Sequence, residues 1–297
     1  MLGSNFNALH GTFVKTYGSH KQQEHCLKGP LDSIIGDIVE GNLQEPSAVA
    51  VCDPGKTIAI LDNRGIRLFD YRNEQFLAVV QLNRSYRGLG CTVRGDFVTV
   101  RRMHNGGIVE IYSGTKENTL ITSFPYYAPP PFHGSRQINP NPSFIDVSMD
   151  RVIVTDLACN AFTIFNFNKE LIWNCESSYQ LEQRRIIQRQ LDGNSPGHFR
   201  FISGAKFDAN GEILIADAGT ERLQYFDKNG KFKHAVAFDD TFAYASGIAI
   251  NSHHELMVCD RRRNMCKLYK LTGRQAINTY GAKYSYYGQR YNGSRRS

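Results

Sequence analysis

The chain has 297 residues, of which 41% are apolar and 21% charged, and its formal net charge is +7 with an isoelectric point near 9.0. This length and apolar content are enough to bury a substantial core in one domain. No apolar run reaches the roughly 18 residues of a membrane-spanning helix, and the N-terminus lacks the basic start and apolar stretch of a secretion signal. The seven cysteines show no CxxC spacing, so we expect a cytoplasmic protein with reduced thiols and no membrane association.

Five stretches of the chain share one pattern, in which an apolar strand ends in a charged residue and a polar turn leads into another strand. A further short apolar strand precedes each of them. In chain order the stretches are "KTIAILDNRGIRLFD" (56–70), "GDFVTVRRMHNGGIVEIY" (95–112), "RVIVTDLACNAFTIFN" (151–166), "GEILIADAGTERLQYFDKNGKF" (211–232) and "VCDRRRNMCKLY" (258–269). Their strand-end residues are Asp62, Arg101, Asp156, Asp217 and Asp260. Each stretch therefore predicts short strands joined by tight polar turns.

The strand-end residues are separated by 39, 55, 61 and 43 positions. A period near 40 with four short strands in each unit is typical of a β-propeller. Two insertions account for the longer separations. The first, "FPYYAPPPFHG" (124–134), cannot pair as a central strand because three consecutive prolines remove ladder donors. The second, "SSYQLEQRRIIQRQL" (177–191), has apolar residues at helical spacing, and we expect a short helix there with its arginines outward.

The fourth stretch, read as "ISGAKFDANGEILIADAGTERLQYFDKNGKF" (202–232), resembles the NHL repeat in its small-residue turn, its second strand ending in aspartate, its "R-x-Q-x-F" third strand and its closing "N-G-K-F". The resemblance covers residues 42–281 in five copies and is poorest in the second copy. It implies an all-β NHL-type propeller of four-stranded blades, and members of this family commonly have six blades. "GTFVKTYGS" (11–19) resembles a detached outer strand that pairs with the last blade and closes the ring.

The number of blades remains open at this point, because only five full copies are visible and a sixth blade would have to be assembled from both termini. We expect one propeller domain over residues 1–283, with residues 1–41 as the closing strand and a linker. Residues 284–297, "YSYYGQRYNGSRRS", are rich in Tyr, Arg and Gly without apolar periodicity, so we expect a disordered tail.

Within this family the net charge of +7 favours a resemblance to the propellers of TRIM-type post-transcriptional regulators, which bind RNA and repress mRNA translation. It implies single-stranded RNA, here mRNA, as the partner, with uridine-rich strands preferred and with protein cofactors of mRNA repression as further partners. A basic chain suits a polyanion. The same charge is equally compatible with a surface that is merely soluble. Duplex DNA is not expected as a ligand.

The repeat alignment predicts which residues lie on one face. In a propeller the turns between second and third strands emerge on the same face as the connections that enter the first strands. Arginines for phosphate, amides for base edges and aromatic rings for unstacked bases are what single-stranded RNA requires. The residues that we expect to contact RNA are Arg64, Tyr86, Arg87, Arg101, Arg102, His104, Asn160, Phe201, Arg222, Tyr244, Arg261, Arg262, Arg263 and Asn264.

Several of these residues have a structural alternative. Phe201 and Tyr244 could instead pack under a neighbouring loop, and Arg222 could pair with Glu221 or with a blade aspartate. The strand-end aspartates are interpreted as turn caps rather than ligands, because aspartate accepts hydrogen bonds from nearby backbone donors. Three adjacent arginines at 261–263 repel one another and have no evident role in the fold, which favours a phosphate partner.

Two other functions are compatible with a propeller. A protein-docking propeller is the main alternative, and a propeller hydrolase or lyase is less favoured. The nine histidines occupy unlike positions in their repeats and form no HxH or HExxH spacing, and no GxSxG or P-loop motif is present. We therefore expect no catalytic residues, no cofactor and no metal.

Overall fold

The computed structural model describes residues 10–17, 43, 45–52, 56–72, 75–82, 85–114, 119–126, 139–174, 196–238, 240–251 and 253–272. The predicted helix at 177–191 and the predicted tail at 284–297 lie outside these residues. No helix in the described part of the chain is long and apolar enough to cross a lipid bilayer.

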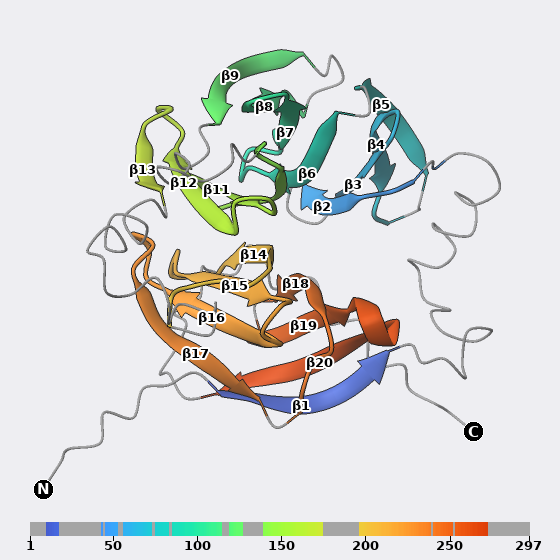
Figure 1. Cartoon of the computed structure of the whole chain (residues 1–297). Helices are drawn as coiled ribbons and strands as arrows, with labels where there is room; N and C mark the ends of the chain where they lie inside the picture. The colour runs from blue at the N-terminus through green and yellow to red at the C-terminus, as the bar shows by residue number, and fades with distance from the viewer. Residues whose placement is uncertain are drawn as a thin grey trace, which may run out of the picture.

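The described strands form five four-stranded antiparallel blades arranged around an axis (Figure 1). Blade 1 contains β2 (Ala48–Cys52), β3 (Thr57–Asp62), β4 (Gly65–Asp70) and β5 (Phe76–Gln81), and blade 2 contains β6 (Tyr86–Cys91), β7 (Phe97–Met103), β8 (Gly106–Tyr112) and β9 (Leu120–Tyr126). Blade 3 contains β10 (Pro142–Val147), β11 (Arg151–Asp156), β12 (Ala161–Asn166) and β13 (Leu171–Asn174), and blade 4 contains β14 (Ile202–Phe207), β15 (Ile213–Asp217), β16 (Arg222–Phe226) and β17 (Phe232–Phe238). Blade 5 contains β18 (Ala245–Ile250), β19 (Glu255–Asp260), the 3₁₀ turn η1 (Arg261–Arg263), β20 (Met265–Thr272) and β1 (His10–Tyr17). The predicted all-β propeller of four-stranded blades is confirmed.

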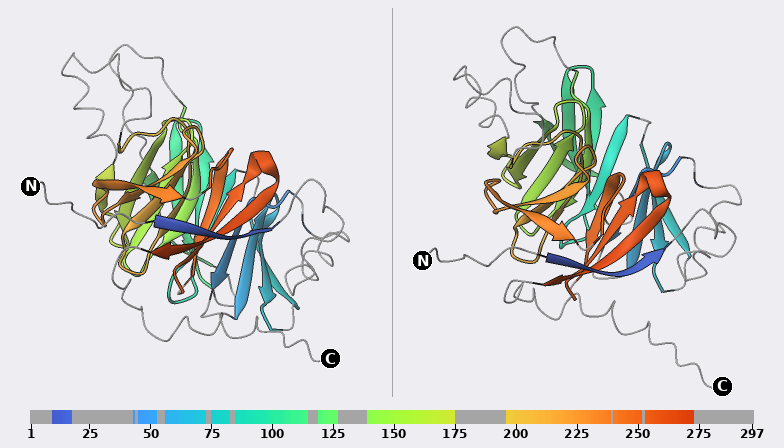
Figure 2. Two further views of the ribbon diagram at one scale, coloured as in Figure 1. Left: turned by 90° about the horizontal axis from the view of Figure 1, so that it is seen from below. Right: turned by 60° about the horizontal axis from the view of Figure 1, so that its bottom comes forward.

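The N-terminal strand β1 completes the last blade. It pairs antiparallel with β20 from His10↔Thr272 to Tyr17↔Cys266, and it makes two parallel pairings with β17 of blade 4. Blades 4 and 5 thereby form one eight-stranded sheet in which β1 lies between β17 and β20, and Figure 2 shows β1 running alongside blade 5. The expectation that the segment near residues 11–17 is the outer strand of the last blade is confirmed. Without it, β20 would present an unpaired edge to solvent.

The core consists of apolar side chains that fill the spaces between successive blades. Alternate residues of a strand face opposite sides of the sheet, so one set from each blade packs on the preceding blade. Between blades 4 and 5, Leu214 and Tyr225 pack with Leu256, Val258 and Tyr269. Similar clusters join blades 3 and 4, 2 and 3, and 1 and 2. Each fully buried side chain of this kind contributes about 1.5–3 kcal/mol to folding.

The flank between blade 5 and blade 1 differs from the others. The first strands pack in the order β2, β6, β10, β14 and β18, but within the described residues β18 makes no comparable contact with β2. On β2 the side chains of Val49 and Val51 are 60% and 50% exposed, although the first strands of a propeller line its centre. The described strands therefore form five blades. Apart from β1, the terminal residues from which a sixth blade would be built lie outside the described part of the chain.

A disulfide joins Cys52 and Cys91, the last residues of β2 and β6, whose Cα atoms are 5.5 Å apart. The expectation that all cysteines are reduced thiols is wrong for this pair. It missed the disulfide because the two residues are 39 positions apart in sequence, and only the packing of the first strands of neighbouring blades brings their sulfur atoms together. Cys259 and Cys266 are half-buried thiols outside any disulfide, and Cys159 is buried.

Deleting residues 1–17 tests the role of β1. The deletion uncovers the edge of β20, where Tyr269 and Leu271 are buried. We expect the free energy of unfolding to fall by at least about 3 kcal/mol, because each apolar side chain returned to water costs about 1.5–3 kcal/mol. Urea denaturation followed by fluorescence measures it. Deletion of residues 284–297 is the length control, and equal stability of the two truncated proteins would contradict the role of β1.

Candidate functional site

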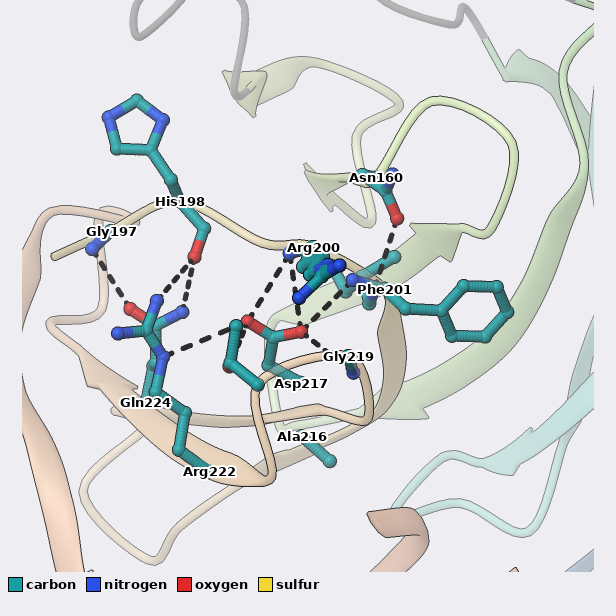
Figure 3. Close-up of polar contacts among 12 residues, drawn as sticks. Asn160, Gly197, His198, Arg200, Phe201, Ala216, Asp217, Gly219, Arg222 and Gln224 are labelled. Atoms are coloured by element: carbon teal, nitrogen blue, oxygen red, sulfur yellow. Dashed lines mark hydrogen bonds and ion pairs between the residues drawn. The ribbon is translucent and has the colours of Figure 1, made fainter. Parts of the chain in front are cut away.

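Asp217, the last residue of β15, organises the loops of blade 4 (Figure 3). Its side chain is fully buried. One carboxylate oxygen accepts hydrogen bonds from the backbone N–H groups of Phe201 at 3.0 Å and Gly219 at 3.3 Å, and the other accepts one from the Thr220 hydroxyl at 2.6 Å. Phe201 precedes the first strand of the blade, whereas Gly219 and Thr220 belong to the turn between the second and third strands. The carboxylate therefore ties two loops of one face together.

The other strand-end aspartates are buried in the same way. Asp156 accepts backbone N–H groups from Asn141 at 2.9 Å and from Ala158 at 2.9 Å, and Asp260 accepts them from Ala243 at 2.8 Å and Tyr244 at 3.1 Å. Asp62 caps its own turn, through Arg64 N at 2.8 Å and Gly65 N at 3.0 Å, and it also pairs with Arg67. Their interpretation as turn caps is confirmed.

Blade 2 has no aspartate at the end of its second strand and stabilises this position with other residues. Arg101 occupies the aspartate position and forms an ion pair with Glu110 of β8, with a nitrogen to oxygen distance of 3.0 Å. The hydroxyl groups of Tyr86 and Tyr112 donate to the other oxygen of Glu110 at 2.6 and 2.8 Å. Burial and the hydrogen bond to Glu110 raise the pKa of Tyr86. Arg101 is therefore engaged within its own blade.

Three predicted RNA contacts need correction on this basis. Tyr86 is only 8% exposed and belongs to the core between blades 1 and 2, so its ring cannot stack on a base. Arg101 neutralises Glu110, and Arg87 directs a guanidinium nitrogen to the backbone oxygen of Tyr86 at 2.8 Å. The sequence could not show this, because the partner Glu110 lies on a different strand.

Blades 3 and 4 each contain one further predicted contact that supports the fold. Asn160 accepts a hydrogen bond from the backbone N–H of Ile202 at 3.2 Å, which links blade 3 to blade 4. Arg222 donates to the backbone oxygen of His198 at 3.0 Å and lies 3.7 Å from Asp217, so the alternative of pairing with a blade aspartate is correct (Figure 3). Both side chains therefore have partners within the protein.

The remaining predicted residues lie at the surface of the same face. Arg64, Arg102, His104, Arg261, Arg262 and Asn264 are exposed, and Arg263 is half-buried. Backbone hydrogen bonds from Leu82 to Arg64, from Arg102 to Ser85 and from Arg261 to Tyr244 bring the turns and the loops that precede first strands together on this face. Arg200, which the sequence analysis did not select, is exposed there as well. Its position one residue before Phe201 was the available signal.

We call the exposed cations Arg64, Arg102, Arg200, Arg261 and Arg262 the arginine face. Beside them, the rings of Phe201 and Tyr244 lie with centroids 5.8 Å apart and planes tilted by 51°. Both residues are half-buried, so each keeps part of its surface open. The two rings come from the loops that precede β14 and β18, the first strands of adjacent blades, which lie toward the middle of the ring (Figure 1).

The conformation of η1 explains how Arg261 and Arg262 reach solvent. Asp260 caps the turn by accepting the Arg263 N–H at 3.3 Å, and Asn264 ends it in the left-handed region at φ 50°. Arg263 donates to the backbone oxygen of Thr241 at 2.6 Å. Within the described residues, Arg261 and Arg262 have no ion-pair partner. The turn thus holds one arginine against the blade and presents two.

A buried polar position on the third strand of each blade was not anticipated. It holds Arg67, Glu110, Thr163, Gln224 and Lys267, all at most 9% exposed. Gln224 accepts from Gly197 N at 2.9 Å and donates to the His198 oxygen at 2.6 Å, and Lys267 donates to the Thr241 oxygen at 2.6 Å. These side chains anchor the loops that carry Phe201 and Tyr244. The "R-x-Q" of the fourth repeat was the one sequence signal for this position.

Lys267 also forms an ion pair with Asp240, with a nitrogen to oxygen distance of 2.6 Å. The lysine is 3% exposed, and its hydrogen bond lowers the pKa of Asp240. The pair closes the loop that begins blade 5.

In the part of the chain that the structure describes, no group of three or more His, Cys, Asp or Glu side chains could hold a metal ion. His104 contacts its neighbour Asn105 at 2.7 Å, and His253 and His254 lie at the turn between β18 and β19, on the opposite face. The absence of a cofactor and of catalysis remains a prediction.

No family model matches the chain, and no curated protein matches it. Solved structures resemble it in fold. Streptogramin B lyase superimposes with a TM-score of 0.52 at 10% identity, over 93% of this chain and 76% of that one. A regucalcin from Agrobacterium tumefaciens str. C58, described as calcium-binding, has a TM-score of 0.51 at 13% identity, over 77% of each chain. A protein of unknown function from Bacteroides caccae has a TM-score of 0.52 at 11% identity, over 74% and 72%. These likenesses show a β-propeller.

Asp217→Ala tests the role of the strand-end aspartate. Several buried donors lose their acceptor, so we expect the free energy of unfolding to fall by about 2–4 kcal/mol. Asp227→Ala is the matched control, because Asp227 accepts the N–H groups of Asn229 and Lys231 in an exposed turn, and we expect it to cost less than about 1 kcal/mol. Urea denaturation of both variants compares them, and equal losses would refute a special role for the buried carboxylate.

Lys267→Met tests the ion pair with Asp240. Because the folded-state pKa of Asp240 lies below its ordinary value, the pair stabilises the protein above the unfolded pKa of about 3.9 and loses this contribution as the pH falls through the folded pKa. We expect the free energy of unfolding of the variant to be about 1–3 kcal/mol lower than that of the parent at neutral pH. Below about pH 4 it should fall less steeply than that of the parent. Unfolding curves recorded from pH 7 to pH 2 measure both. If the stability of the variant falls at low pH as steeply as that of the parent, the ion pair is not the cause of this fall.

Proposed function

We propose that the arginine face binds single-stranded RNA, with mRNA as the physiological ligand and post-transcriptional repression as the outcome. The observation that carries the proposal is the combination of five exposed arginines with the ring pair of Phe201 and Tyr244 on one face. Cations neutralise phosphates, and rings stack on unpaired bases.

The distribution of exposed and paired arginines supports this proposal. The net charge of +7 alone does not select a partner, but Arg64, Arg102, Arg200, Arg261 and Arg262 are exposed on one surface while Arg101, Arg222 and Arg263 pair with carboxylates of their own blades. Arginine binds phosphate oxygens through its planar fork of donors. The exposed set is thus available for an external anion.

The aromatic pair supports single-stranded rather than duplex ligands. A base can stack on a ring only when it is not stacked in a helix, and duplex RNA is recognised mainly through its backbone and shape. Stacking tolerates any base, so the proposed preference for uridine-rich strands would come from contacts other than the two rings.

Protein docking is the competing function. A face that binds an acidic protein would use the same arginines. Such a face would bind single-stranded and duplex RNA equally well. We also propose that the face acts by binding and without catalysis, and that the protein works in the cytoplasm, where mRNA is translated. The Cys52–Cys91 disulfide is unusual for that compartment, so cell fractionation is the direct check of location.

Arg261→Ala/Arg262→Ala should weaken binding of a fluorescein-labelled 20-nucleotide uridine strand at least about tenfold. Each phosphate contact on a single strand adds roughly −0.7 to the slope of log affinity against log salt, so two lost contacts should flatten that slope by about 1.4. Fluorescence anisotropy at several salt concentrations measures both. Lys228→Ala/Lys231→Ala is the matched control, because it removes the same charge from an exposed turn on the opposite face.

The aromatic half of the site has its own variant. Tyr244→Ala should cost roughly 1–3 kcal/mol of binding energy if a base stacks there, and it should leave the salt slope nearly unchanged because stacking releases no counterion. Duplex RNA of the same length should bind more weakly than the single strand. If the double arginine variant binds RNA as well as the parent, the proposed function is wrong, and if duplex and single strands bind equally, protein docking or simple charge attraction is favoured.

A further inference from the structure

Blade 5 contains two thiols that face each other across neighbouring strands. Cys259 of β19 and Cys266 of β20 are direct partners in the antiparallel ladder, and their sulfur atoms are 3.3 Å apart. Both residues are half-buried free thiols, unlike Cys159, which is buried. They flank the η1 turn that carries Arg261 and Arg262.

The surroundings leave the two sulfur atoms accessible from one side. Val258, Leu256 and Tyr269 pack against blade 4, and because side chains alternate along a strand, the thiols point to the other side of the sheet. On β18 the neighbouring residue is Gly247, and even a Cβ atom added to it would lie 3.8 Å from the Cys259 sulfur. On the β18 side, the thiols therefore have a glycine as their neighbour. This side of blade 5 is also the flank where β18 lacks extensive contact with β2.

The backbone geometry permits a covalent bond between them. Directly opposed residues of an antiparallel pair have Cα atoms about 4.5 or 5.5 Å apart, and both values lie within the roughly 4.4–6.8 Å range of disulfides. The sulfur atoms need to approach only from 3.3 Å to about 2.05 Å, which side-chain rotation and a small strand shift can supply. A cross-strand bond of this kind on an open side of the sheet is exposed to reductants and therefore reversible.

We propose that Cys259 and Cys266 form a thiol–disulfide exchange site, which low-molecular-weight disulfides such as oxidised glutathione convert to a cross-strand disulfide at the base of the arginine turn. The Cys266 thiolate attacks one sulfur of the reagent, the reagent's S–S bond breaks, and one glutathione thiolate leaves. Cys259 then loses its proton to solvent and attacks the Cys266 sulfur of the mixed disulfide, and the second glutathione thiolate leaves. The protein loses two electrons and two protons, and the reagent is reduced to two thiols.

The assignment of Cys266 as the attacking group follows from the hydrogen bond between the sulfur atoms. Donation from the Cys259 thiol lowers the pKa of Cys266 to about 7, although partial burial opposes this. The same contact raises the pKa of Cys259. A thiol whose pKa lies close to the surrounding pH is an effective nucleophile in exchange. The sulfur contact and the strand register carry the proposal independently of these shifts.

The test uses the full chain, reduced and then equilibrated with oxidised glutathione before free thiols are blocked with N-ethylmaleimide. Trypsin cleaves after Arg261 and Arg263, so Cys259 and Cys266 fall on separate peptides, 234–261 and 264–267. We expect a linked pair of these peptides that dithiothreitol separates. Peptides 29–56 and 88–94 report the Cys52–Cys91 disulfide in the same digest.

Two serine variants distinguish the roles of the thiols. In Cys259→Ser no resolving thiol remains, so a stable glutathione adduct should accumulate on Cys266, at least about tenfold faster than on the buried Cys159. In Cys266→Ser the adduct on Cys259 should form more slowly. Circular dichroism and melting temperature show that each variant is folded. The proposal is overturned if the folded parent yields no linked peptides, or if Cys266 in Cys259→Ser reacts no faster than Cys159.

Discussion

Buried carboxylates at the ends of second strands are the constraint on which this propeller depends. A tight turn leaves backbone N–H groups without partners, and an unpaired buried donor costs about 1–3 kcal/mol. In blades 3, 4 and 5 the carboxylates of Asp156, Asp217 and Asp260 satisfy donors from the turn and from the loop before the first strand at once. One side chain therefore sets the distance between two loops that the sequence keeps about 16 residues apart.

The arrangement of the arginine face follows from this capping. Phe201 and Tyr244 are held by their backbone N–H groups to Asp217 and Asp260, so their rings meet at 5.8 Å from two different blades. Gln224 and Lys267 support the same two loops from the third strands. Blade 2, where Arg101 replaces the aspartate, stabilises the position with Glu110 and two tyrosines and leaves Arg102 and its turn exposed. The side chains that could bind a ligand are therefore held at backbone positions that the fold fixes.

Blade 5 concentrates the remaining reactive groups. Its η1 turn presents two arginines, its loop carries Tyr244, and its strands place two thiols 3.3 Å apart directly below the turn. The blade also depends on β1, which comes from the opposite end of the chain. The first and last strands that the structure describes, β1 and β20, therefore meet in the blade that carries most of the proposed chemistry. Among the described residues, the flank beside this blade, where Val49 and Val51 are exposed, is the least closed part of the ring.

The sequence alone determined the repeat, the four strands of each blade, the closing strand and the capping role of the aspartates, because these depend on local alternation and on turn chemistry that recurs at a fixed period. It also placed the turns on one face, since that follows from strand count. It could not determine which arginines remain open. Arg101, Arg222 and Arg263 find partners on neighbouring strands or loops, and Tyr86 enters the space between two blades. The Cys52–Cys91 disulfide and the Cys259–Cys266 contact were likewise decided by tertiary structure, because strand register and blade packing alone set the distances between their sulfur atoms.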